Sequence, residues 1–208
     1  LDYIQDIIQI EINSTTDNPV IISELPEKTK ALSGGNFHAQ PIAFAADLLS
    51  MVLCEVGSIA ERRIFRLSDK SLNNGLPSFL TANSGLESGL MLAQYTAASL
   101  VSENRALAHP ASIDSIPTCE NQEDHVSMAP IAARKASAIL QNVQKIVAIE
   151  LLYAAQALDL RKEQSSNKSA DSLFGRGTTT AYQELRKKIP FISSDQPLYS
   201  HISTAVDL

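Results

Sequence analysis

The sequence predicts an all-α fold in which long, mostly antiparallel helices form an elongated bundle. Hydrophobic residues make up 44% of the 208 residues, while aromatic residues make up only 5% and Trp is absent. Alanine and leucine must therefore supply most of the packing, and such side chains suit helices that approach one another closely. Several long segments also carry apolar residues three and four positions apart, which is the spacing of a helix with one buried face.

The N-terminal part is expected to begin with a helix over residues 2–13. Ile4, Ile7, Ile8 and Ile12 recur there at helical spacing. The helix should end before Asn18-Pro19, because a residue that precedes proline disfavours the helical conformation. Residues 20–22 are β-branched and predict a short strand, and residues 23–35 predict a loop. Nothing before Leu1 could cap the first helix, so we expect the sequence to be a fragment of a longer protein.

Two further helices are expected, over about residues 39–66 and 86–108. A loop with dense turn chemistry, including Asn73-Asn74-Gly75-Leu76-Pro77, separates them. The small residues of the second of these helices should let its neighbours come close, and Pro110 should end it. The buried stripe of the first is expected to consist of its large apolar residues, namely Phe44, Leu48, Met51, Val52, Val56, Ile59 and Ile64.

The longest expected helix covers about residues 124–160. At 1.5 Å per residue it would be roughly 55 Å long, whereas a compact globule of this chain length would be only about 43 Å across. Residues 146–160 are apolar on nearly all sides, so we expect other helices, including those of other subunits, to surround them. We expect residues 1–160 to form a central helical bundle that carries part of an active site, and residues 161–208 to form a C-terminal loop with short helices.

Charge and cysteine content exclude several classes of function. The net charge is −6 and no basic stripe is visible, which argues against a nucleic-acid partner. No apolar run of about 18 residues lacks a charge or an amide, so we expect no membrane segment. Cys54 and Cys119 are isolated and match no disulfide framework or zinc motif. We therefore expect a cytoplasmic protein that binds no metal.

A run of polar residues from Ser115 to Met128 is the strongest functional signal in the sequence. It contains Glu120, Asn121, Gln122, Glu123, Asp124 and His125 without interruption. The run is expected to open the longest helix, where unpaired N–H groups and the helix dipole favour negative charge. Glu123, flanked by two amides, is the best acid–base residue of the chain. The alternative is that these residues cap the helix and do nothing more.

Three other features have both a functional and a structural interpretation. Gly34-Gly35-Asn36-Phe37-His38 precedes a helix and could bind an anion through backbone N–H groups, or it could be a flexible connector. His38 and His125 lie near polar runs, but neither has a second histidine at ligand spacing, and a lone histidine is more often a hydrogen-bonded structural residue than a ligand or base. Met91 lies between Leu90 and Leu92 and, from its neighbours alone, is a core residue.

Several blocks in a fixed order give the chain a resemblance to a known family. They are Glu11-Ile12-Asn13, Thr16-Asp17-Asn18-Pro19, Gly34-Gly35-Asn36-Phe37-His38, Asn74-Gly75-Leu76-Pro77, the run from Asn121 to Met128, and segments of residues 149–161. Together they resemble the C-terminal part of the aromatic amino acid ammonia-lyases. The resemblance covers most of the chain, and it is strongest over residues 1–160.

The resemblance implies a mostly helical homotetramer with long helices at its centre. It also implies elimination of ammonia from an amino acid to give an α,β-unsaturated acid. The Gln122-Glu123 pair favours the branch of the family that converts L-histidine to urocanate over the branches that act on tyrosine or phenylalanine. By motif, Glu123 would be the catalytic carboxylate, and Phe37, Met91, Asn121 and Gln122 would bind the substrate or surround the electrophile.

One departure from the family pattern is large. The family's electrophile, 4-methylideneimidazole-5-one (MIO), forms from an internal Ala-Ser-Gly, and this sequence has no such tripeptide. The resemblance also places the family's catalytic tyrosines and carboxylate-binding arginine before Leu1. We therefore expect the chain alone to be inactive, with half of an active site. A non-catalytic helical module that serves only association is the rival hypothesis from a different class.

Overall fold

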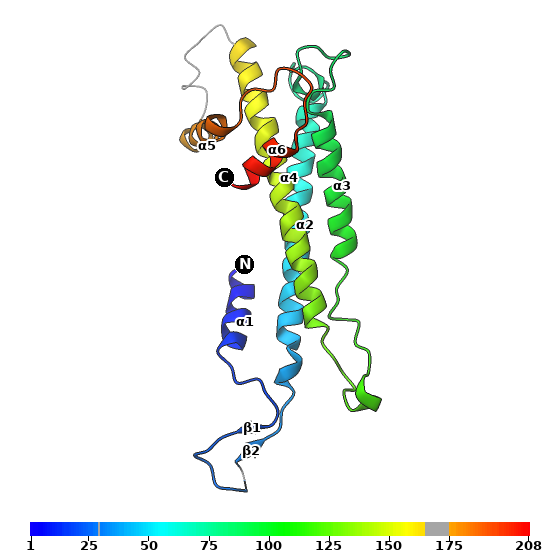
Figure 1. The fold of residues 1–208 in the computed structure, drawn as a ribbon, viewed down its shortest axis with the longest axis vertical. Helices are drawn as coiled ribbons and strands as arrows, with labels where there is room; N and C mark the ends of the chain where they lie inside the picture. The colour runs from blue at the N-terminus through cyan, green and yellow to red at the C-terminus, as the bar shows by residue number, and fades with distance from the viewer. Residues whose placement is uncertain (29, 165–174) are drawn as a thin grey trace. The chain divides into compact units, whose positions relative to one another are not determined.

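The structure, a computed structural model, describes residues 1–28, 30–164 and 175–208, and it confirms the all-α class (Figure 1). The helices are α1 (Asp2–Ile12), α2 (Gln40–Ser68), α3 (Met91–Leu107), α4 (Ala129–Gln164), α5 (Arg176–Lys188) and α6 (Tyr199–Val206). Three 3-10 turns, η1 (Asn36–His38), η2 (Ser78–Leu80) and η3 (Cys119–Asn121), lie between them. The expected short strand is β1 (Val20–Ile21), which pairs antiparallel with β2 (Ala31–Leu32), a strand that the sequence did not predict.

The chain divides into two compact units, and α2 and α4 each contribute to both. The first unit comprises Leu1–Cys54 and Arg105–Leu140, and the second comprises Glu55–Asn104 and Gln141–Leu208. The C-terminal segment therefore belongs to the second unit. The division at residue 160 that the sequence indicated stays a prediction, and part of its C-terminal segment, residues 165–174, lies outside the described residues.

The core of the second unit lies between α2, α3 and α4. In Figure 1, α3 runs opposite in direction to the parts of α2 and α4 that lie beside it in this unit. Buried apolar side chains from all three helices form one cluster, including Ile64, Val101 and Ile149. Small residues such as Ala93 and Ala97 are fully covered, as the sequence predicted for a close helix contact.

The second half of α4 is buried by the chain's own C-terminal segment. Ala148, Leu152 and Ala155 pack against Leu185 and Ile189, which come from α5 and the residue that follows it. The opposite face of α4 contributes to the core shared with α2 and α3. Helices α5 and α6 therefore cover part of residues 146–160 within the chain, and the expected contact with other subunits stays a prediction.

The predicted buried stripe of α2 is wrong at five of its seven positions, while Ile64 is buried and Leu48 is half-buried as expected. The stripe that the structure buries or half-buries recurs every three or four residues and consists of Ala43, Asp47, Ser50, Cys54, Gly57, Glu61, Ile64 and Ser68. Small side chains allow close packing, and the buried polar ones are bonded: the Asp47 carboxylate, for example, accepts from the Ser112 N–H at 2.8 Å. Phe44 and Ile59, from the predicted stripe, are instead 55% and 54% exposed.

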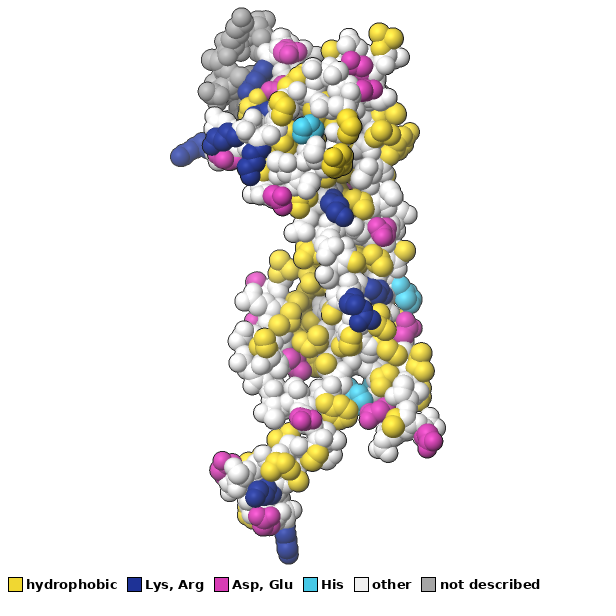
Figure 2. All heavy atoms as spheres, in the orientation of Figure 1, with side chains coloured by type: hydrophobic (Ala, Val, Ile, Leu, Met, Phe, Trp, Pro, Cys, Tyr) yellow, Lys and Arg dark blue, Asp and Glu magenta, His cyan; other side chains and the backbone are white. Residues whose placement is uncertain are grey.

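This exposed apolar face makes α2 unusual among the helices. Within the described residues, the stretch Asn36–Ser68 is the one helix long and apolar enough to span a membrane by length and composition, with a mean hydropathy of 1.8 in its most apolar window. Only 28% of that window is buried, and hydrophobic side chains cover much of the surface in Figure 2. One helix of this kind is weak evidence for a membrane span, because core helices and signal sequences meet the same criteria of length and composition.

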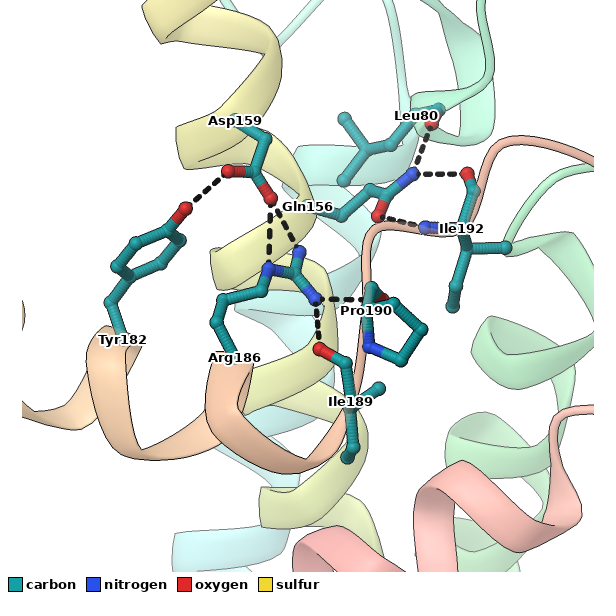
Figure 3. Close-up of polar contacts among 8 residues, drawn as sticks. All are labelled: Leu80, Gln156, Asp159, Tyr182, Arg186, Ile189, Pro190 and Ile192. Carbon is teal, nitrogen blue, oxygen red and sulfur yellow. Dashed lines mark hydrogen bonds and ion pairs between the residues drawn. The ribbon is translucent and has the colours of Figure 1, made fainter.

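A buried polar network ties the C-terminal segment to α4 (Figure 3). The Asp159 carboxylate accepts from the Tyr182 hydroxyl and from Arg186 Nε at 2.9 Å. Arg186 Nη1 in turn donates to two backbone carbonyls that follow α5. Gln156, which is 1% exposed, donates to the carbonyls of Leu80 and Ile192 and accepts from the Ile192 N–H.

Candidate functional site

The polar run before α4 is a closed loop rather than the first turn of a helix. Thr118 and Glu123 pair as an antiparallel bridge, with N–H to carbonyl distances of 3.0 and 3.3 Å. Between them, Cys119, Glu120 and Asn121 have φ values of 52°, 55° and 67°. Consecutive residues other than glycine seldom adopt this left-handed conformation, which costs about 1–3 kcal/mol each and is concentrated at functional sites.

This geometry contradicts the interpretation of Glu123 as a helix cap. Helix α4 begins at Ala129, six positions after Glu123, and not at Asp124 as the sequence predicted. The residue that serves the helix start is Ser127, whose Oγ accepts from the Ala129 N–H at 3.1 Å. The Glu123 carboxylate is therefore not needed by α4, and another role must explain its position.

The same serine joins this loop to the segment that precedes α2. Ser127 Oγ donates a short hydrogen bond to the backbone carbonyl of His38, the last residue of η1. The contact joins residues 89 positions apart, and Ser127 is buried. One hydroxyl thus caps α4 and fixes the backbone of η1 beside the loop.

The contact brings the His38 imidazole to the Glu123 carboxylate. His38 Nε2 lies 3.1 Å from Glu123 Oε2, and the two side chains are 24% and 34% exposed. In the described part of the chain, the other carboxylate oxygen of Glu123 has no hydrogen-bond partner. The ring of Phe37 lies against the imidazole, with centroids 4.2 Å apart. A half-exposed carboxylate with one free oxygen can accept a proton or hold a cationic group.

The other histidine of the run has a different partner. His125 Nε2 lies 3.2 Å from Gln40 Oε1, at the first residue of α2. That contact ties the loop to the start of α2. The histidine that contacts the Glu123 carboxylate is therefore His38 and not His125. The two histidines look alike in the sequence, because their spacing does not show which one meets a carboxylate.

Four of the five predicted site residues come together in the first unit. Phe37 lies in η1, Asn121 and Gln122 are exposed on the loop, and Glu123 closes it. Met91, the fifth, is half-buried as the first residue of α3 in the second unit. Its neighbours predicted a core residue, and the structure covers the side chain only in part.

One backbone N–H of the glycine pair, that of Gly34, is already engaged within the chain, and the anion site that the sequence allowed stays a prediction. Asn18 Oδ1 accepts from the Gly34 N–H at 3.2 Å and from the Ser33 hydroxyl at 2.9 Å. The Gly35 carbonyl accepts from the His38 N–H at 3.2 Å. The segment is thus tied back to the turn before β1, and its polar groups serve its own fold.

The described residues also form a cavity, which lies apart from the predicted site residues. A cavity of about 480 Å³ in the second unit is lined by Arg63, Arg66, Arg161 and Leu76 among others, and it includes none of the predicted site residues. Within the described ranges, no group of three or more His, Cys, Asp or Glu side chains could hold a metal ion. Neither the cavity nor a metal cluster thus adds a residue to the candidate site around Glu123 in the described part of the chain.

Comparisons of this chain with a family model and with curated proteins agree on one family. Residues 1–187 match the family described as aromatic amino acid lyase. Histidine ammonia-lyase from Natranaerobius thermophilus is 52% identical over 207 residues, which cover 100% of this chain and 39% of that protein. The chain thus spans about two fifths of the length of the curated relatives that it matches.

Solved structures agree with the fold. The crystal structure of histidine ammonia-lyase from Trypanosoma cruzi matches with a TM-score of 0.85 and 40% identity, over 99% of this chain and 38% of that one. A tyrosine aminomutase from Streptomyces globisporus matches with a TM-score of 0.88 and 36% identity, over 98% and 37% of the respective chains.

Proposed function

Because the chain belongs to the aromatic amino acid lyase family, we propose that it supplies part of the active site of an ammonia-lyase that converts L-histidine to urocanate. The observation that carries the proposal is Glu123, a carboxylate held on a strained loop with one oxygen free. Relatives named histidine ammonia-lyase at about 50% identity support histidine as the substrate. The adjacent Gln122 supports the same branch.

Glu123 has two tasks in this proposal. Elimination breaks a C–N bond and a C–H bond of the amino acid and releases ammonia, so a proton must leave the substrate. A carboxylate with a free oxygen can hold the substrate's ammonium group and take a proton as the reaction proceeds. Because Glu123 caps no helix, its charge is available for this purpose.

Four further side chains would bind the substrate or surround the electrophile, namely Phe37, Asn121, Gln122 and Met91. Phe37 is 41% exposed beside the His38 ring, so part of its ring is free to contact an aromatic substrate. The exposed amides of Asn121 and Gln122 can donate and accept hydrogen bonds on the same loop. Met91 would contact the substrate ring, for which a flexible thioether is suited.

The family's MIO group would supply the electrophile that activates the amino group. This chain contains no Ala-Ser-Gly from which the group could form. The exposed Phe37 ring and the Asn121 amide are nevertheless of the types that could pack against a small planar polar group. We therefore propose that these two residues form part of its surroundings and that another segment of the whole protein provides the group itself.

We also propose that the whole protein is a homo-oligomer, a tetramer by analogy with the family. The support is the exposed face of α2, where Phe44, Met51, Val52, Val56 and Ile59 are each more than 40% exposed. Burial of such surface contributes about 25 cal/mol per Å². Neither Cys54 nor Cys119 forms a disulfide in the described part of the chain, and this is the observation behind our proposal of a cytoplasmic location.

The proposal is tested with Glu123→Gln in the whole protein, because glutamine keeps the shape and removes the charge. A positioned acid–base group contributes about a hundredfold to ten-thousandfold in rate, so turnover of L-histidine should fall within that range. Glu120→Gln is the matched control, since Glu120 is an exposed glutamate three positions away on the same loop. It should leave the rate within about twofold, because an exposed substitution disturbs little.

The substrate is tested in the same assay with L-tyrosine and L-phenylalanine beside L-histidine. The similarity to a tyrosine aminomutase makes tyrosine the main rival. Ammonia release from L-histidine with the highest kcat/KM supports the proposal. A preference for L-tyrosine would move the protein to another branch of the family and contradict the substrate assignment.

A further inference from the structure

We propose that His38 is a positioning residue that acts through Glu123, by holding its carboxylate in the orientation that the reaction needs. This inference rests on the proposed function, because it assigns a task to the residue beside the proposed catalytic carboxylate. The observation behind it is the 3.1 Å separation of His38 Nε2 and Glu123 Oε2, between residues 85 positions apart in the sequence.

The His38 imidazole is not needed to build the turn in which it lies. The His38 N–H donates to the Gly35 carbonyl at 3.2 Å, and the His38 carbonyl accepts from the Ser127 hydroxyl. The following residue, Ala39, closes the turn in the left-handed conformation with φ of 55°. Backbone contacts therefore fix η1, and the side chain is free to serve another group.

The imidazole itself is held in place from one side. The Phe37 ring lies 4.2 Å from it, centroid to centroid, at an interplanar angle of 35°. The imidazole nitrogen that faces the carboxylate must carry a hydrogen to attract it, which fixes the tautomer of a neutral His38. A ring backed by an aromatic neighbour and aimed at one carboxylate oxygen restricts how that carboxylate can rotate.

The carboxylate needs such a partner because its own loop does not fix it. The backbone of Glu123 is paired with Thr118, but in the described ranges its side chain has His38 as its one polar contact. A side chain that is 34% exposed would otherwise sample several rotamers. Catalytic groups must be held close to their productive geometry, and a displacement of about 1 Å can cost on the order of a hundredfold in rate.

The test is a double-mutant cycle in the whole protein, with His38→Leu, Glu123→Gln and both together. We expect His38→Leu to lower kcat by about tenfold to a hundredfold, with a smaller change in KM. In the Glu123→Gln background the same change should lower kcat by less than about twofold, because the carboxylate that His38 positions is already gone. His38→Gln, which keeps an N–H donor on a side chain of similar reach, should retain most of the activity.

His109→Leu is the matched control, because His109 is an exposed histidine of the same unit. Its side chain has no part in the site described above, so kcat should stay near that of the unchanged protein. If His38→Leu does not yield folded protein, the comparison of His38→Gln with His38→Asn replaces it. The shorter asparagine should lose activity that glutamine keeps.

The outcomes separate this inference from the proposed function. Equal losses from His38→Leu in both backgrounds would show that His38 acts independently of Glu123 and would overturn the inference, while Glu123→Gln could still support the proposed function. Full activity in Glu123→Gln would overturn the proposed function itself. Loss in His38→Leu that Glu123→Gln abolishes, with rescue by His38→Gln, is the result that supports the inference.

Discussion

Two carboxylates near α4 show how differently one chain can use the same chemical group. Asp159 lies in a network where the Tyr182 hydroxyl and the Arg186 guanidinium occupy its oxygens, and its side chain is 18% exposed. Glu123 is 34% exposed and closes a loop that contains three left-handed residues. Its carboxylate contacts His38 through one oxygen only. The first carboxylate is fully used by the fold. The second has one oxygen without a partner in the described residues, which is the basis of the chemical role proposed above, and its strained loop costs stability that the rest of the structure must supply.

The largest effect we expect concerns the chain by itself. Without an Ala-Ser-Gly tripeptide it cannot form the family's electrophile, so the 208-residue chain should release no ammonia from L-histidine. Absorbance of urocanate and an ammonia assay both measure this. Turnover above the buffer blank would show that Glu123 and its neighbours suffice for the reaction, and our division of the active site would be wrong.

A smaller effect is expected from Gln156→Leu, which removes the buried amide beside the Asp159 network. The change removes the donor for the Leu80 and Ile192 carbonyls and leaves the Ile192 N–H without its acceptor. A buried group left unsatisfied costs about 1–3 kcal/mol, and chemical denaturation should show a loss of this size. Turnover per folded molecule should not change. A stability equal to that of the unchanged protein would mean that the network contributes nothing to the fold.

The smallest effect concerns Tyr153 in the core of the second unit. Burial raises the pKa of its phenol, and its hydroxyl donates to the Leu90 carbonyl at 2.7 Å. Tyr153→Phe should cost about 1 kcal/mol at neutral pH, since the Leu90 carbonyl keeps the N–H groups of Ala93 and Gln94.

Tyr153 should also affect the dependence of stability on pH. A raised pKa in the folded state means that the phenol's contribution is complete below pH about 10, its ordinary value, and is lost as the pH rises further. Tyr153→Phe should therefore flatten the fall in stability above that pH in denaturation curves. An unchanged alkaline slope would contradict the burial that the structure assigns to this phenol.

Local patterns predicted most of the helices but not what they contact. Helices α1 and α2 lie within two residues of their expected ranges and α3 lies inside its expected range, because apolar spacing and proline positions are local signals. The buried face of α2 was predicted from side-chain size, and the structure buries Ala43, Gly57 and Glu61 instead of Phe44 and Ile59. Periodicity identifies a stripe but does not say which of two stripes the same chain covers.

The candidate site could likewise be predicted only in part: its residues could be selected from the sequence, but their contacts could not. Glu123 could be selected from its polar neighbours and from the family resemblance. Its loop could not be predicted, because residues 119–121 adopt left-handed conformations although none of them is glycine. The contact with His38 depends on Ser127, whose hydroxyl joins two segments 89 residues apart. Such a contact is long-range, and no spacing in the sequence encodes it.

The most direct test compares substitutions of the two carboxylates, each measured for activity and for stability. In the whole protein, Glu123→Gln and Asp159→Asn are each measured for turnover of L-histidine and for stability. We predict that Glu123→Gln lowers kcat by at least about a hundredfold with little loss of stability. Asp159→Asn should cost about 2–4 kcal/mol, because it leaves the mostly buried Arg186 unpaired, and should leave kcat within about twofold. Equal effects of the two substitutions on both quantities, or their reversal, would contradict the assignment of Glu123 to chemistry and Asp159 to the fold.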